Sequence, residues 1–116
     1  MAFSANETET ILQQLEDHFW TLRRPPLQLR DQVREGQRIE RQSIELFLNR
    51  PAFQRPGEWI EERIARLRYV RSRNLWEIDI WLSDLEWQLY EAFPKADTLP
   101  DALAEIHRDQ HGCFFG

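Results

Sequence analysis

The chain has 116 residues, of which 41% are hydrophobic and 12% aromatic, with five tryptophans. This length suits one domain, residues 1–116, and the composition is that of a packed globule rather than a disordered chain. A single cysteine, Cys113, excludes an internal disulfide and indicates a reducing compartment. No apolar run reaches the ~20 residues that cross a bilayer, and no basic-then-apolar leader opens the sequence, so we expect a cytoplasmic protein without a membrane partner.

Charge is segregated along the chain, although the net charge is only −5. Residues 1–22 hold four acids and no lysine or arginine, whereas residues 23–73 hold thirteen arginines against seven acids. Residues 74–116 hold nine acids against Lys95 and Arg108. A basic centre between acidic ends fits either a nucleic-acid footprint or segments that neutralise one another after folding.

The first expected element is a helix over about residues 5–22. Ser4 followed by Glu7 is a capping box, in which the hydroxyl and the carboxylate each accept from an amide of the first turn. Apolar residues then recur at helical spacing as far as Leu22, and the two prolines after Arg24 end the pattern.

From about residue 27 to residue 93 the apolar pattern changes to a period of two, which predicts an antiparallel meander of four or five strands. The charged stretch 32–39 is expected to be an edge strand, followed by strands near 44–48 and 60–71. Prolines and a glycine predict a loop between residues 50 and 59.

The last hairpin of the meander has a clear alternating pattern. A two-residue turn at Ser83 and Asp84 places Ile80 opposite Trp87 on the apolar face and leaves Trp81 on the other face. The pattern therefore predicts both the turn and the register of this hairpin.

The strand before this hairpin brings opposite charges together. An even-length turn aligns Arg66 and Arg68 with Glu77 and Asp79. Such cross-strand pairs contribute about 0.2–1 kcal/mol each, so this ladder absorbs part of the arginine surplus inside the protein.

A second helix is expected at about residues 98–111, with Thr98 as its cap and Gly112 as the left-handed residue that closes it. Phe114 and Phe115 are expected to fold back onto the core. The order helix, strands, helix predicts an α+β two-layer sandwich with both helices on the apolar face of the sheet and the other face open.

This open face is the main functional indication in the sequence. It is expected to carry Phe47, Val70, Trp81 and Tyr90 beside charged residues, which is more apolar than a solvated sheet face needs to be. The leading hypothesis is a non-enzymatic interaction module that uses these four residues to meet itself or another protein.

Single-stranded nucleic-acid binding through the arginine-rich strands is the alternative hypothesis. Arginine suits both bidentate phosphate contacts and stacking on bases. The acidic net charge and the lack of a nucleic-acid-binding fingerprint oppose it. The candidate residues are Arg23, Arg24, Arg30, Arg34, Arg38, Arg63, Arg71 and Arg73.

Catalysis and cofactor binding have little support in the sequence. It contains no glycine-rich phosphate loop and no nucleophile with a recognisable base motif, so we assign no catalytic residue and no cofactor. His107, His111 and Cys113 form the one cluster of soft ligands. A zinc site there would need Cys113 to swing back and a fourth ligand, so we assign no metal and keep these three as weak candidates.

Dispersed motifs carry a resemblance to a known family. They are Arg23-Arg24-Pro25-Pro26, Arg50-Pro51, Tyr69-Val70-Arg71 before Trp76, then Trp87 and Tyr90, and the ending from Asp109 to Gly116. Over nearly its whole length the chain resembles a bacterial family known as domain of unknown function 3024. The resemblance implies a compact standalone protein and no agreed activity. The segment Arg23-Arg24-Pro25-Pro26 has two possible roles. Either Pro25 and Pro26 stiffen the helix-to-sheet connection while a neighbouring arginine pairs nearby, or the segment has a binding role.

Overall fold

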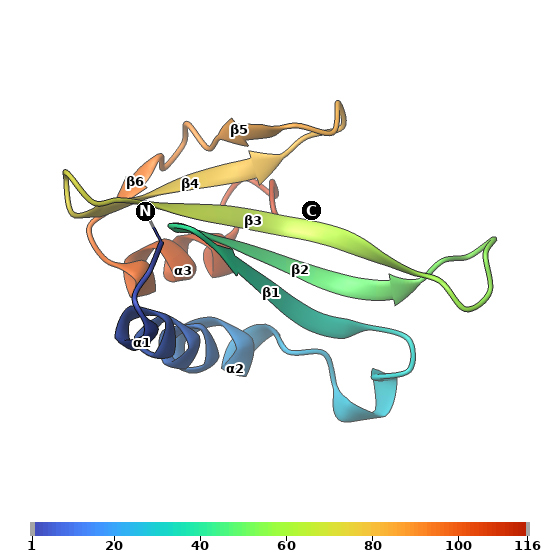
Figure 1. Ribbon diagram of the computed structural model, residues 1–116. Helices are drawn as coiled ribbons and strands as arrows, with labels where there is room; N and C mark the ends of the chain where they lie inside the picture. The colour runs from blue at the N-terminus through green and yellow to red at the C-terminus, as the bar shows by residue number, and fades with distance from the viewer. Residues whose placement is uncertain (1, 116) are drawn as a thin grey trace.

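A computed structural model describes residues 2–115 and shows an antiparallel sheet with all helices on one of its faces (Figure 1). This arrangement confirms the predicted α+β sandwich. The elements in chain order are α1 (Ala5–Leu15), the π-helical turn η1 (Glu16–Trp20), α2 (Thr21–Arg23), the 3-10 turn η2 (Leu27–Leu29), β1 (Arg34–Glu40), β2 (Ser43–Pro51), β3 (Trp59–Val70), β4 (Leu75–Trp81), β5 (Trp87–Leu89), β6 (Lys95–Ala96) and α3 (Leu99–Arg108).

The N-terminal helix begins and ends close to where the sequence predicts. Glu7 donates its amide hydrogen to Ser4 Oγ over 3.1 Å, and the Ser4 amide donates to Glu7 Oε1 over 2.9 Å, so the capping box is confirmed. The π-helical turn η1 was not expected. A π turn inserts an extra residue into the helical repeat, and here the adjacent Phe19 and Trp20 are both buried.

The sheet is a meander in the order β1-β2-β3-β4-β5, with every neighbouring pair antiparallel. The predicted edge strand, the two strands after it and the loop between them are confirmed. Arg66 pairs with Asp79 and Arg68 with Glu77, as the alternation predicts. The short strand β6 was not expected, and it pairs with β4 next to β5.

The predicted register of the last hairpin is wrong by one residue. Trp81, not Ile80, pairs with Trp87. Leu85 adopts a left-handed conformation with φ of 63°, and the amide of Leu82 donates to the carbonyl of Glu86, so the turn is one residue longer than expected. Three-residue hairpin loops commonly end in such a left-handed residue.

Because the turn is one residue longer, each side chain of the following strand lies on the face opposite to the predicted one. Trp87 and Leu89 pair with Trp81 and Asp79 on the open face. Tyr90 turns into the core, where it is 3% exposed and contacts Phe114 edge to face at 4.8 Å between ring centroids. The predicted position of Tyr90 on the open face is therefore wrong.

The C-terminal helix begins after Thr98, whose hydroxyl accepts from the amide of Asp101 over 3.2 Å as predicted. Its predicted end is wrong, because the helix stops at Arg108 and Asp109 takes the left-handed position with φ of 45°. The carboxylate of Asp109 accepts from the amides of Phe114 and Phe115 over 2.9 and 2.8 Å. These bonds turn the chain back, so that both phenylalanines pack on the core as expected.

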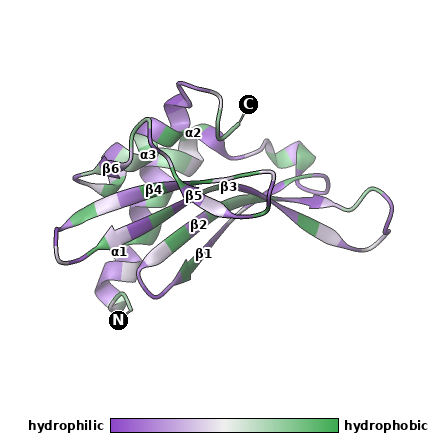
Figure 2. Cartoon of the chain, turned by 90° about the horizontal axis from the view of Figure 1, so that it is seen from above, coloured by the Kyte–Doolittle hydropathy of each residue, from purple (hydrophilic) through white to green (hydrophobic). Residues whose placement is uncertain are grey.

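The core lies between the helices and the inward face of β2, β3 and β4. Hydrophobic and hydrophilic residues alternate along these strands when the sheet is seen from above (Figure 2). No helix within residues 2–115 is long and apolar enough to cross a membrane.

Gly36 provides a test of the close contact between β1 and β2. A Cβ atom at this position would lie 2.4 Å from Phe47 Cε2. We expect Gly36→Ala to lower the free energy of unfolding by about 1–3 kcal/mol, because the ring has to leave its position. Urea denaturation of Gly36→Ala, Phe47→Leu and the double variant measures this.

In that series the shorter leucine side chain of Phe47→Leu should recover part of the loss caused by Gly36→Ala, so the two effects should not add. A Gly36→Ala variant as stable as the parent protein would contradict the contact.

Candidate protein-interaction surface

The sheet face opposite the helices is the open face, and no element of residues 2–115 covers it (Figure 1). Strand pairing assigns its side chains, because residues that are direct partners in an antiparallel pair lie on the same face. They include Arg34, Arg38, Glu45, Phe47, Arg63, Arg66, Arg68, Val70, Glu77, Asp79, Trp81, Trp87 and Leu89.

An ion cluster occupies the middle of the open face. Asp79 is only 1% exposed, and its Oδ2 atom accepts from Arg66 Nε over 2.8 Å and from Arg68 Nε over 2.6 Å. Arg68 Nη2 also donates to Asp79 Oδ1 over 2.8 Å, which makes this contact bidentate. These hydrogen bonds raise the pKa of the Arg68 guanidinium against the opposing effect of burial. One buried carboxylate thus binds two arginines of the neighbouring strand.

Two arginines of the open face lie over tryptophan rings, and we call Arg63, Arg66, Trp81 and Trp87 the Arg–Trp cluster. The Arg63 guanidinium carbon lies 4.2 Å from the centroid of Trp81, and that of Arg66 lies 5.2 Å from the centroid of Trp87. The two indoles meet edge to face at 5.1 Å between centroids, and both are half-buried. Arg63 differs from Arg66 in making no ion pair within residues 2–115.

The four residues of the interaction hypothesis differ in the face on which they lie and in their exposure. Val70 and Trp81 lie half-buried on the open face as predicted. Phe47 lies on this face but is only 7% exposed, because the Arg38 guanidinium covers its ring at 5.0 Å. Tyr90 belongs to the core, as described above. The sequence reasoning missed Trp87 and Leu89, and only the length of the turn before them could have revealed their side of the sheet.

Most arginines of the nucleic-acid hypothesis already have partners in the chain. Arg23 contacts His107, Arg24 contacts Glu16 and Glu35, Arg30 contacts Glu35, Arg38 contacts Glu45 and Glu61, and Arg71 contacts Glu7. In the described part of the chain, Arg34, Arg63 and Arg73 make no ion pair. Arg34 lies over Trp59 at 4.6 Å from the ring centroid, whereas Arg73 lies in the turn between β3 and β4.

The weak metal candidates do not form a site. Residues 2–115 contain no group of three or more His, Cys, Asp or Glu side chains that could hold a metal ion. Nδ1 of His107 accepts from Arg23 Nε over 3.1 Å, whereas His111 and Cys113 are exposed in the turn that follows α3.

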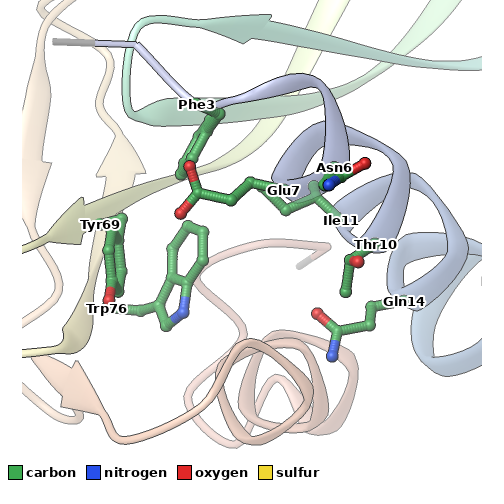
Figure 3. A pocket seen from close by; sticks show the side chains of 8 residues that line it. All are labelled: Phe3, Asn6, Glu7, Thr10, Ile11, Gln14, Tyr69 and Trp76. Atoms are coloured by element: carbon green, nitrogen blue, oxygen red, sulfur yellow. The ribbon is translucent and has the colours of Figure 1, made fainter.

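A pocket of about 300 Å³ lies between α1 and the end of β3 and β4 (Figure 3). Phe3, Tyr69 and Trp76 form its aromatic wall, with ring centroids 5.0–6.3 Å apart, and Glu7 extends from α1 toward them. The Glu7 carboxylate accepts from Arg71 over 3.1 and 3.2 Å. Glu7 lies on α1 and Arg71 directly follows β3, so this ion pair joins the N-terminal helix to the sheet.

The Glu7–Arg71 contact has a testable pH dependence. The hydrogen bonds from Arg71, followed by that from the Ser4 amide, lower the pKa of Glu7. A carboxylate with a lowered pKa stabilises the fold above its unfolded pKa of about 4.3, and this contribution is lost as the pH falls through the folded pKa. Glu7→Gln should therefore lower the melting temperature at neutral pH, and the difference from the parent protein should shrink in acid.

Thermal melts followed by circular dichroism between neutral and acid pH measure this difference. Glu9→Gln is the matched control, because Glu9 is exposed on the same helix. A Glu7→Gln difference that stays the same at every pH would refute the role of this ion pair.

Comparison with known proteins assigns the chain to a family. A family model described as Domain of unknown function (DUF3024) matches residues 3–116. The chain belongs to this family. For this DUF3024 protein, no curated protein and no solved structure is significantly similar. The resemblance found in the dispersed motifs is therefore confirmed.

Proposed function

We propose that this DUF3024 protein is a non-enzymatic interaction module whose open face binds an acidic, extended segment of a partner protein. The observation that carries the proposal is the Arg–Trp cluster, in which Arg63 and Trp81 are stacked and partly exposed on a face that no element of residues 2–115 covers. A cytoplasmic location remains a prediction.

The residue types of the cluster are those that dominate binding energy at protein interfaces. Tryptophan and arginine are enriched among hot spots, where a rigid anchor loses little conformational entropy on binding. The edge-to-face contact of Trp81 and Trp87 and the stacked guanidinium of Arg63 hold these side chains in place before a partner arrives. Such preorganisation favours a docking surface over a solvated sheet face.

The charges on the open face indicate which kind of partner segment it would bind. The two positive charges of Arg66 and Arg68 in the middle of the face are balanced by the carboxylates of Asp79 and Glu77. Arg63 and Arg34 lack a carboxylate from the described chain and lie over Trp81 and Trp59. A segment with aspartate or glutamate beside apolar residues would supply the missing carboxylates and cover the indole rings.

The dimensions of the face fit this use. The four gaps between the five strands, at about 4.8 Å each, span about 19 Å, and the twelve residues of β3 extend over about 40 Å at ~3.3 Å per residue. This surface is of the same order as the ~800 Å² that each partner contributes to a standard protein interface.

A protein partner is favoured over nucleic acid by the charge distribution. Binding to a phosphate backbone depends on several cations that can neutralise phosphates, whereas five of the eight candidate arginines are already engaged and the net charge is −5. The remaining arginines are also separated, because Arg63 lies within β3 whereas Arg73 lies in the turn that follows this strand.

Selection from a random-sequence peptide library tests the proposal. We expect the enriched peptides to contain Asp or Glu next to aromatic or aliphatic residues. Their affinity, measured by fluorescence anisotropy, should fall at least ten-fold, or about 1.4 kcal/mol, in Arg63→Glu. Arg73→Glu makes the same charge change away from the cluster and should bind like the parent protein.

Peptides that bind Arg63→Glu and the parent protein equally, or a library that yields no binders, would contradict the proposal. Single-stranded oligothymidylate is tested in parallel. If it binds with steep salt dependence and Arg63→Glu abolishes that binding, the nucleic-acid alternative replaces the protein partner.

A further inference from the structure

A groove in the helical layer is separate from the open face. It lies where the π-helical turn η1 packs beside α3, and its volume of about 660 Å³ is within the ~300–1,000 Å³ range of small-molecule sites. Five of its lining residues are charged or are histidines: Asp17, His18, Arg23, His107 and Arg108. The groove therefore concentrates polar side chains that the interaction surface does not use.

Arg23 fixes the orientation and the tautomer of His107. Its Nε donates to His107 Nδ1 over 3.1 Å, and its Nη2 donates to the His107 carbonyl oxygen over 2.8 Å. With Nδ1 accepting this hydrogen bond, Nε2 is the ring nitrogen left to donate a hydrogen to a ligand. The ring of Phe115 stacks on the Arg23 guanidinium at 3.7 Å and keeps it in place. His107 is thus held as a hydrogen-bond donor.

Other groups of the lining add hydrogen-bond donors. The Arg108 side chain is 62% exposed, and Nη1 alone is used, in a contact with Glu105 over 2.7 Å. His18 is exposed on η1 and makes no hydrogen bond within the described residues. Asp17, the one acid in the lining, accepts from Gln13 over 2.9 Å. Donors therefore exceed unoccupied acceptors in this groove.

Local backbone structure places these donors on two facing elements. His18 lies within η1, and π turns interrupt the regular helical spacing and occur frequently at functional sites. Arg23 is the last residue of α2, and His107 and Arg108 are in the last turn of α3. A ligand in the groove would meet one set of donors from each side.

We propose that this groove binds a small oxyanion, namely the phosphate or carboxylate group of a metabolite. Arg108 and His18 bind the anion directly, and His107 donates from Nε2. Arg23 is a positioning residue, which acts through the orientation of His107. The site requires no contact with the open face, so it is independent of the proposed partner binding.

Titration with inorganic phosphate and, in a separate arm, with citrate tests the proposal on the intact chain. Backbone and imidazole NMR signals report binding, with sodium chloride at matched ionic strength as the control. We expect saturable shifts at His18, His107 and Arg108 with one or both anions. The affinity should fall at least ten-fold in Arg108→Gln and in His18→Ala.

Arg73→Gln is the matched control, because Arg73 is an exposed arginine that does not line the groove, and this variant should leave the affinity unchanged. The two anions separate the sources of the oxyanion: phosphate alone indicates a phosphorylated metabolite, and citrate alone a carboxylate. Shifts equal to those caused by sodium chloride, or binding that both groove variants retain, would overturn the proposal.

Arg23→Lys keeps the charge but cannot make both contacts to His107. We expect it to change the imidazole signals of His107 before any anion is added, and to weaken binding less than Arg108→Gln does. Unchanged His107 signals in Arg23→Lys would overturn the positioning role.

Discussion

The carboxylate of Asp79 is the group on which the open face depends. A sheet face that no helix covers has to keep its polar groups satisfied, and this one carries Arg66 and Arg68 at alternate positions of one strand. Asp79 binds both through three hydrogen bonds and is itself almost inaccessible to water. Leaving a buried charge without its partner typically costs about 3–5 kcal/mol, so the three side chains form one unit. The fold therefore satisfies the buried charge of the open face without a covering helix.

The two arginines that follow the N-terminal helix have separate structural roles. Arg24 bridges Glu16 on the π turn and Glu35 on β1, whereas Arg23 reaches across to His107 and Phe115. With two prolines next to them, these contacts fix the direction in which the chain leaves the helix. The segment thus has the structural role that proline stiffening and arginine pairing predict, and through Arg23 it also forms one wall of the groove.

Local chemistry made much of this fold predictable. The capping box at Ser4, the cap at Thr98 and the alignment of Arg66 with Asp79 follow from patterns only a few residues long. The register of the last hairpin was not predictable in this way, because Leu85 has no sequence signal for a left-handed conformation, yet the longer turn decides which face each residue of β5 occupies. The end of α3 depends on hydrogen bonds that Asp109 makes to residues beyond the helix. The π turn was not predictable either, because the apolar residues keep helical spacing as far as Leu22 and give no sign of it. The groove could not be predicted, since His18 and Arg108 are ninety residues apart in the chain.

A double-mutant cycle between Asp79 and Arg68 tests most directly whether the ion cluster supports the open face. Urea denaturation gives the free energies of unfolding of the parent protein, Asp79→Ala, Arg68→Ala and the double variant. The account predicts a coupling energy of at least about 1 kcal/mol, because the double variant no longer leaves the bidentate partner unpaired. Additive losses, with a coupling within about 0.3 kcal/mol of zero, would contradict it.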